Sequence, residues 1–265
     1  MLRVFAQTNV GMVREGNEDS FLVVDTTSEH QETLPKIMEY PSSENGLILM
    51  VSDGMGGAAA GEVASHLAVK TTMQELKFPS PPTAEEFEQG LNTALHTANR
   101  VIADFAERNP RMYGMGATAT TIGVLKDQLF IGQVGDSRAY LIRGDDIEQL
   151  TRDQSFVNQL VEAGKITEEE AETHPRRNVI LQALGNQPNL NVAITKTDLK
   201  DGDFILICSD GLSGIVKKEE MYEVVTNAEN TLAACNQLVN LANQRGGHDN
   251  ITIVLAEYLQ AEQNS

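Results

Sequence analysis

The stretch Gly46-Leu-Ile-Leu-Met-Val51 is a short, continuous apolar run that ends directly in Ser52-Asp53-Gly54. A run of this length indicates a buried β-strand. The same arrangement returns at Asp203-Phe-Ile-Leu-Ile-Cys208, which ends in Ser209-Asp210-Gly211. Each copy places a carboxylate where a buried strand ends and follows it with a glycine, which we expect to let the backbone turn sharply. The two copies therefore predict a core with acidic side chains at its edge.

Three further acidic residues occupy comparable positions. Asp136 lies in a tight turn within Gln133-Val-Gly-Asp-Ser-Arg138, Asp249 precedes a strand in Gly246-Gly-His-Asp-Asn250, and Asp19 closes Arg14-Glu-Gly-Asn-Glu-Asp19. A single Asp-Gly pair is an ordinary turn signal. Five acids that converge at strand ends would instead repel one another at neutral pH unless a cation neutralised them.

The residue types restrict which cation this would be. Only oxygen ligands are offered, without a His or Cys cluster, which favours Mg or Mn over Zn. Two such ions can lower the pKa of a water and direct it at phosphorus. Arg14, in the same segment as Asp19, is placed to clamp a phosphate. Without the neighbouring motif, a surface ion pair would be the simpler reading of Arg14.

Two helices are predicted after the first strand. The segment 60–76 has helical composition and ends at the proline-rich break 78–83. Thr83 and Glu86 have the spacing of a capping box, which marks a helix start. Spacings of three and four then give that helix one apolar face, formed by Phe87, Leu91, Leu95, Ala98, Ile102 and Phe105, before Asn109-Pro110 stops it.

The rest of the chain predicts more strands and shorter helices. Residues 116–150 alternate and carry turns about every ten residues, which is typical of an antiparallel meander. Residues 151–190 predict a peripheral subdomain with two short helices, the second opened by a capping box at Thr167 and Glu170. A helix over 232–245, capped by glycines, precedes a strand at 251–256. The pattern predicts an α+β fold with mainly antiparallel sheets, as one domain over 1–258 with a tail at 259–265.

Composition restricts the partners and the compartment. The net charge of -18 argues against nucleic acid and anionic membranes, because both are polyanions. The cysteines, Cys208 and Cys235, lie among apolar residues and predict reduced core thiols. The chain shows neither a signal-peptide pattern nor an apolar run of membrane-spanning length. We expect a cytoplasmic monomer.

Taken in order, the motifs closely resemble those of the metal-dependent serine/threonine phosphatases (type 2C, PPM), in particular bacterial single-domain members. The resemblance extends from about Phe5 to Leu255, and its specificity comes from the whole set in sequence. The matching segments are Arg14-Glu-Gly-Asn-Glu-Asp19, Asp53-Gly-Met-Gly-Gly57, Gly116-Ala-Thr118, Val134-Gly-Asp-Ser-Arg138, Cys208-Ser-Asp-Gly211 and Gly247-His-Asp-Asn250.

The resemblance implies a four-layer α-β-β-α sandwich with a binuclear Mn or Mg centre at one end of the two sheets. By this resemblance Asp53 bridges both metals, Asp210 and Asp249 complete the shell of the first, and the Gly54 carbonyl serves the second. The remaining implied roles are metal-water binding for Asp19, a weaker third metal for Asp136, phosphate binding for Arg14, and a position for His174 on a flap beside the site, formed by residues 151–190.

The resemblance also implies the reaction and the partners. It implies that a metal-activated water hydrolyses phosphoserine or phosphothreonine in proteins, within the pathway of a serine/threonine kinase. Some members have a His at the position of Met55, and that His is proposed as the general acid. Met cannot donate a proton, so another group must protonate the leaving alkoxide. The segment 26–45 is longer than in compact bacterial members, and we expect an inert surface loop or hairpin there rather than a regulatory contact.

Other readings are less consistent with the sequence. Gly54-Met-Gly-Gly-Ala-Ala59 matches a dinucleotide-binding fingerprint, but Asp53 would repel a pyrophosphate and no βα alternation follows. An aspartate-nucleophile phosphatase would want a second Asp at position 55, which is Met, and no P-loop is present. A catalytically silent scaffold that binds phosphoproteins is the alternative from another class. Such a scaffold would be expected to lack a metal-binding Asp, but Asp is present at positions 53, 210 and 249.

Overall fold

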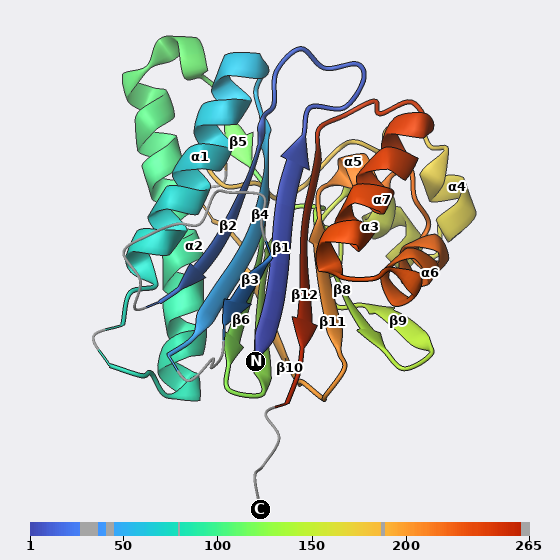
Figure 1. The fold of residues 1–265 in the computed structure, drawn as a ribbon. Helices are drawn as coiled ribbons and strands as arrows, with labels where there is room; N and C mark the ends of the chain where they lie inside the picture. Colours follow the sequence, from blue (N-terminus) through green and yellow to red (C-terminus); the bar gives the residue numbers. More distant parts are fainter. Residues whose placement is uncertain (27–36, 41–44, 79, 187–188, 261–265) are drawn as a thin grey trace, which may run out of the picture.

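Two β-sheets form the centre of the molecule, and the computed structural model describes residues 1–26, 37–40, 45–78, 80–186 and 189–260 (Figure 1). The first sheet has the strand order β3-β1-β12-β11-β8-β9, with every neighbouring pair antiparallel. Its strands are β1 (Leu2–Asn9), β3 (Met38–Tyr40), β8 (Arg138–Arg143), β9 (Asp146–Gln149), β11 (Phe204–Cys208) and β12 (Ile251–Tyr258).

The second sheet is also antiparallel throughout and has the order β10-β7-β6-β4-β2, with β5 paired to the end of β4. Its strands are β2 (Asp19–Asp25), β4 (Leu47–Met55), β5 (Gly116–Ala117), β6 (Ala119–Leu125), β7 (Gln128–Val134) and β10 (Ala193–Asp198).

Helices cover the outer face of each sheet, which confirms the predicted four layers (Figure 1). The second sheet is covered by α1 (Ala58–Glu75) and α2 (Ala84–Arg108), and the first by α5 (Asp210–Ser213), α6 (Lys218–Asn227) and α7 (Thr231–Gln244). The short helices α3 (Phe156–Glu162) and α4 (Glu168–Glu172) lie in the predicted flap, and η1 (Pro110–Met112) follows α2. No helix in the described residues is both long and apolar enough to cross a membrane.

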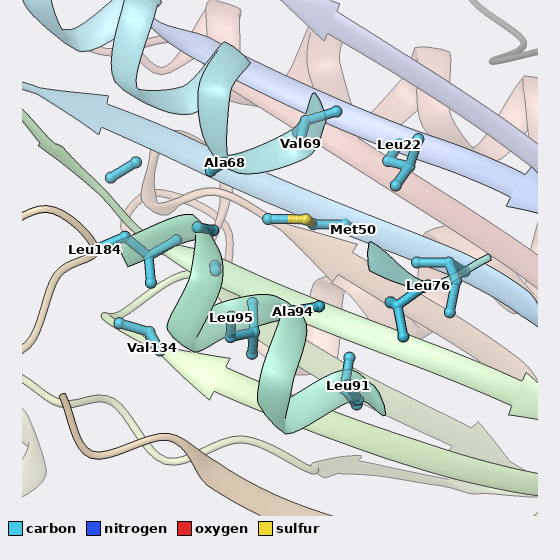
Figure 2. Close-up of a cluster of buried hydrophobic side chains, with 14 of the residues drawn as sticks. Leu22, Met50, Ala68, Val69, Leu76, Leu91, Ala94, Leu95, Val134 and Leu184 are labelled. Atoms are coloured by element: carbon cyan, nitrogen blue, oxygen red, sulfur yellow. The ribbon is translucent and has the colours of Figure 1, made fainter. Parts of the chain in front are cut away.

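Strand β4 shows why its sequence is apolar without alternation. Leu47, Leu49 and Val51 point into the layer between the two sheets, whereas Ile48 and Met50 point toward α1 and α2. Successive side chains of a strand point to opposite faces, and here both faces are covered. Figure 2 shows the outer cluster, where Met50 and Leu22 lie among side chains of α1 and α2.

The capping box predicted for α2 is present. The Thr83 hydroxyl accepts the Glu86 N–H at 3.2 Å, and the Glu86 carboxylate accepts the Thr83 N–H at 2.8 Å. Five of the six predicted face residues are buried, and Phe105 is partly buried at the end of the cluster. The amphipathic pattern therefore predicted both the start and the buried face of this helix.

Two expectations about local backbone were wrong. Residues 116–150 are not one meander, because β6 and β7 belong to one sheet and β8 and β9 to the other. The turn 135–137 carries the chain between the sheets. Gly54 lies within β4 rather than in a sharp turn, and a Cβ at Gly54 or at Gly211 would lie 2.0 Å from a backbone oxygen, of Gly61 and of Asn250 respectively. Close backbone approach is the reason for glycine at both positions.

Other elements were not predicted. The strands β1 and β10 and the helix α6 were left unassigned from the sequence. Within the segment 26–45, Met38–Tyr40 forms β3 at the edge of the first sheet beside β1. The rest of the expectation for this segment concerns 27–36 and 41–44, which lie outside the described residues.

Candidate active site

The five predicted acidic residues come together at one end of the two sheets. Asp19 and Asp53 are direct cross-strand partners, at the start of β2 and near the end of β4. Asp210 is the first residue of α5, directly after β11, and Asp249 lies just before β12. Asp136 lies in the crossing from β7 to β8. Asp53 feels the charge of all four of the others.

Burial and repulsion from neighbouring carboxylates make Asp19, Asp53 and Asp136 hard to ionise. Burial, followed by the negative charges of its neighbours, raises the pKa of Asp53 well above its ordinary value. Burial raises the pKa of Asp19 to about 7, although hydrogen bonds from Thr252 and Ser209 lower it. Burial and the charge of Asp210 raise the pKa of Asp136 to about 8. A bound cation would relieve this repulsion.

Two carboxylate oxygens of the cluster have no hydrogen-bond partner among the described residues. Oδ1 of Asp19 and Oδ1 of Asp210 are both buried and unpartnered, which is costly for a polar atom unless something else binds it. The Asp210 and Asp53 carboxyls lie within hydrogen-bonding reach of each other. Among the described residues, no three His, Cys, Asp or Glu side chains already form a closed ligand set. The side-chain donors of the cluster are all oxygen atoms, the ligand type that a hard cation such as Mg or Mn prefers.

The end of β4 is fixed against the first turn of α1. Gly54 donates its N–H to the Glu18 carbonyl at 3.1 Å. A Cβ on Gly61 would lie 1.9 Å from the Glu18 carboxylate and 2.8 Å from the Gly54 carbonyl oxygen. Gly61 therefore leaves space for both oxygens, and burial raises the pKa of Glu18. Glu18 is a site residue to which the sequence analysis gave no role, although it lies within the motif that ends in Asp19.

A buried polar network connects the strand ends behind the carboxylates. The Thr118 hydroxyl accepts the Asp53 N–H at 2.9 Å and lies 2.8 Å from the Ser137 hydroxyl. Ser52 donates to the Thr118 carbonyl at 2.7 Å. These bonds join β4 to the crossing that contains Asp136, so the positions of Asp53 and Asp136 are coupled through Thr118.

Arg14 lies on the loop between β1 and β2. Its Nη2 lies 2.7 Å from Oδ2 of Asp249, and half of its side chain remains exposed. The Asn250 side chain fixes this loop: it donates to the carbonyls of Val10 (2.9 Å) and Gly16 (3.0 Å) and accepts the Glu18 N–H (2.8 Å). Asn250 was quoted in the motif with Asp249, but the sequence did not indicate this role.

The predicted flap is tied to the site at its base. Arg138 pairs with both oxygens of Asp153, with its Nη2 2.7 Å from Oδ2. His174 lies farther out, where its Nδ1 accepts the Arg176 N–H at 3.1 Å and its ring is 6.0 Å from that of Phe156. The described contacts of His174 do not reach the five aspartates, so the structure does not bring this residue into the carboxylate cluster.

Comparison with known proteins identifies the group to which this arrangement belongs. Residues 38–255 match the family model described as protein phosphatase 2C. The chain belongs to the protein phosphatase 2C family. This phosphatase is 34% identical to the serine/threonine phosphatase stp of Listeria welshimeri, over 95% of its own length and 94% of that protein. It is 35% identical to PstP of Mycobacterium tuberculosis over 97% of this chain, which is 45% of that longer protein.

Solved structures of phosphatases have the same fold. The serine/threonine phosphatase of S. agalactiae superimposes on the phosphatase with a TM-score of 0.87 at 28% identity, over 98% of this chain and 100% of that one. The catalytic domain of PstP, solved in complex with two manganese ions, gives a TM-score of 0.80 at 34% identity, over 98% and 99% of the two chains. The predicted family and fold are therefore confirmed, and the chain is a protein phosphatase.

Proposed function

We propose that this phosphatase hydrolyses phosphoserine and phosphothreonine in proteins at a pair of Mn or Mg ions held by its carboxylate cluster. The observation that carries the proposal is the convergence of the five aspartates, with unpartnered buried oxygens on Asp19 and Asp210. The relatives named above support the substrate class, and the PstP complex supports two manganese ions.

Each residue near the cluster has a proposed part. Asp53 would bridge the two ions, Asp210 and Asp249 would complete the first site, and the Gly54 carbonyl would serve the second. Asp19 would bind water molecules of the second ion, and Asp136 would bind a weaker third ion. When bound, the ions supply charge neutralisation and a water of lowered pKa as nucleophile. Segment 151–190 would act as a flap beside the site within one domain over 1–258, with His174 on that flap and residues 259–265 as a tail.

The protein's own part in the reaction is to orient the phosphate. Arg14 offers a planar, permanently charged group suited to two phosphate oxygens. Water displaces the serine or threonine alkoxide in one step, so the products are inorganic phosphate and the free hydroxyl. We propose no covalent intermediate. The Ser209 hydroxyl donates to Oδ2 of Asp19 at 2.7 Å, but Ser209 is fully buried and therefore closed to a substrate as a nucleophile. Met55 has no acidic proton, so it does not protonate the leaving oxygen.

We further propose that the substrates are phosphoproteins of a serine/threonine kinase pathway and that the enzyme works as a cytoplasmic monomer. With a net charge of -18, nucleic acid and anionic membranes are poor partners.

The proposal is tested with a phosphothreonine peptide and with p-nitrophenyl phosphate, each with Mn, with Mg and with EDTA. We expect hydrolysis that needs metal and falls by orders of magnitude in Asp53→Asn and Asp210→Asn, because both remove a ligand charge. Asp104→Asn is the matched control, since Asp104 is an exposed residue of α2 that lies outside all of the motifs. A folded, metal-loaded protein that binds the phosphopeptide without hydrolysing it would instead indicate a phosphoprotein-binding scaffold.

A further inference from the structure

Exposed apolar side chains are concentrated around the candidate active site. Among the described residues, the exposed large apolar side chains lie on three segments: Val10, Met12 and Val13, then Tyr113, then Val179 and Leu181. Single exposed apolar residues are common on protein surfaces. Their restriction to one region of a chain with a net charge of -18 indicates a recognition surface.

The first segment is the loop that presents Arg14. Met12 is 69% exposed and Val13 is 61% exposed. The loop is nevertheless fixed, because Met12 donates its N–H to the Gly247 carbonyl at 2.8 Å and Asn250 binds the Val10 carbonyl at 2.9 Å. In Figure 1 this loop lies beside the connection from α7 to β12, which contains Asp249. The backbone that carries these two exposed apolar side chains is thus fixed next to the proposed phosphate-binding arginine.

The second segment borders the opposite side of the cluster. Tyr113 is 89% exposed and lies three residues before Gly116, the β5 partner of Met55. A Cβ on Gly56 would lie 3.0 Å from the Met115 backbone. Tyr113 therefore lies beside the end of β4, on the α1 and α2 side of the molecule.

The third segment lies in the predicted flap. Leu181 donates its N–H to the Gln154 carbonyl at 2.7 Å, and the Gln154 side chain accepts the Gly135 N–H at 2.8 Å. Gly135 precedes Asp136 in the cluster. The Val179 carbonyl accepts the Phe156 N–H at 2.8 Å, two residues along from Gln154. The Leu181 backbone is therefore connected through Gln154 to the residue before Asp136, and Val179 lies two residues from Leu181 on the same segment.

We infer that these six residues, called here the apolar rim, bind the side chains that flank the phosphoserine or phosphothreonine of a protein substrate, and that the enzyme selects apolar flanking residues. The inference rests on the proposed function, which fixes the phosphate at Arg14. When the phosphate of a substrate is bound at Arg14, the residues on either side of the phosphorylated residue must lie over the surrounding segments. Apolar neighbours would bury rim surface, whereas acidic neighbours would meet the repulsion of an acidic chain.

The test compares three phosphothreonine peptides that differ only at the residues flanking phosphothreonine: leucine, serine or glutamate on both sides. The wild-type enzyme and the variants Met12→Ser/Val13→Ser and Tyr113→Ser are assayed with Mn. We expect kcat/KM to be about five- to tenfold higher for the leucine peptide than for the serine peptide, as partial burial of apolar side chains on an exposed surface gives, and lowest for the glutamate peptide.

The two variants provide internal controls because they change opposite sides of the site. Peptides with leucine on one side only should respond to one variant and not to the other. Equal kcat/KM for all peptides, or a leucine preference unchanged in both variants, would overturn the inference. It would equally be overturned if the variants changed only self-association in sedimentation, because a second copy would then be the partner of the rim. Failure of wild-type enzyme to hydrolyse any peptide or p-nitrophenyl phosphate would instead overturn the proposed function itself.

Discussion

Nη2 of Arg14 lies 2.7 Å from Oδ2 of Asp249, although the two residues are far apart in the chain. The ion pair joins the proposed phosphate-binding residue to a proposed metal ligand. Because both side chains are partly exposed, the pair itself adds little stability. Its importance is that Arg14 and a metal ion would use the same carboxylate.

We predict that Arg14→Ala separates phosphate binding from metal binding. KM for the phosphopeptide should rise and kcat/KM should fall by about two orders of magnitude, as the loss of a charged phosphate contact gives. The metal concentration for half-maximal activity should not increase, because Asp249 loses a competing cation. Arg3→Lys is the control, since Arg3 is similarly exposed and paired with Glu39 at the other end of β1. A parallel loss of metal affinity in Arg14→Ala would show that Arg14 mainly supports the fold of the site.

Asn250 provides a second prediction, about how the loop carrying Arg14 is positioned. Asn250→Ala removes three hydrogen bonds to backbone groups of residues 10–18. We expect a loss of about 1–3 kcal/mol in the free energy of unfolding, since three partly buried backbone groups lose their partners, together with a larger rise in KM than fall in kcat. Urea denaturation and steady-state kinetics measure the two effects.

Asn227→Ala is the matched control for this prediction. Its side chain also donates to a backbone carbonyl, that of Glu223 at 2.7 Å, but on an exposed turn of α6. We expect this change to stay within about 0.5 kcal/mol of wild type and to leave kinetics unaltered. A normal KM in Asn250→Ala would mean that the loop keeps its position without this side chain.

The metal-free enzyme should lose stability as the pH rises. The pKa values of Asp19 and Asp136 are raised to about 7 and about 8 in the folded protein, whereas the unfolded chain has the ordinary value near 3.8. Between the ordinary pKa and the raised pKa values, the folded protein therefore binds more protons than the unfolded chain. The free energy of unfolding falls as the pH rises through that range. Urea denaturation in EDTA at several pH values measures the slope.

Added Mn should reverse this trend, because metal and protons compete for the same oxygens. The stabilisation by Mn should therefore grow with pH. Asp136→Asn removes one titrating group and should flatten the slope measured in EDTA. Metal-free stability that rises from pH about 5 to about 8 would contradict the raised pKa values.

Helix capping gives a prediction that concerns stability without catalysis. Thr83→Ala should lower the free energy of unfolding by about 1 kcal/mol, because it removes the cap of α2. Thr167→Ala removes the same kind of capping box from α4, which contains no buried residue. We expect a smaller effect on global unfolding there, since α4 can fray locally. Equal losses in the two variants would show that the flap unfolds together with the core.

Much of the candidate site was predictable because its residues are strand-end residues. The apolar runs before Asp53 and Asp210 predicted β4 and β11, and the capping boxes predicted the starts of α2 and α4. Such local sequence patterns do not predict the role of a segment when that role depends on a partner far along the chain. Thus the crossing at 135–137 looks like a hairpin turn in sequence, because a turn residue does not encode which sheet the next strand joins.

By itself the sequence determined which residue types stand at the strand ends, and the family to which the chain belongs. Local periodicity and motif order suffice for that, since both are properties of neighbouring residues. Only the tertiary structure decided that Asp19 lies opposite Asp53, that Asn250 holds the Arg14 loop, and that the exposed apolar residues gather around one site. Those relationships arise from strand register and layer packing, in which segments far apart along the chain become neighbours.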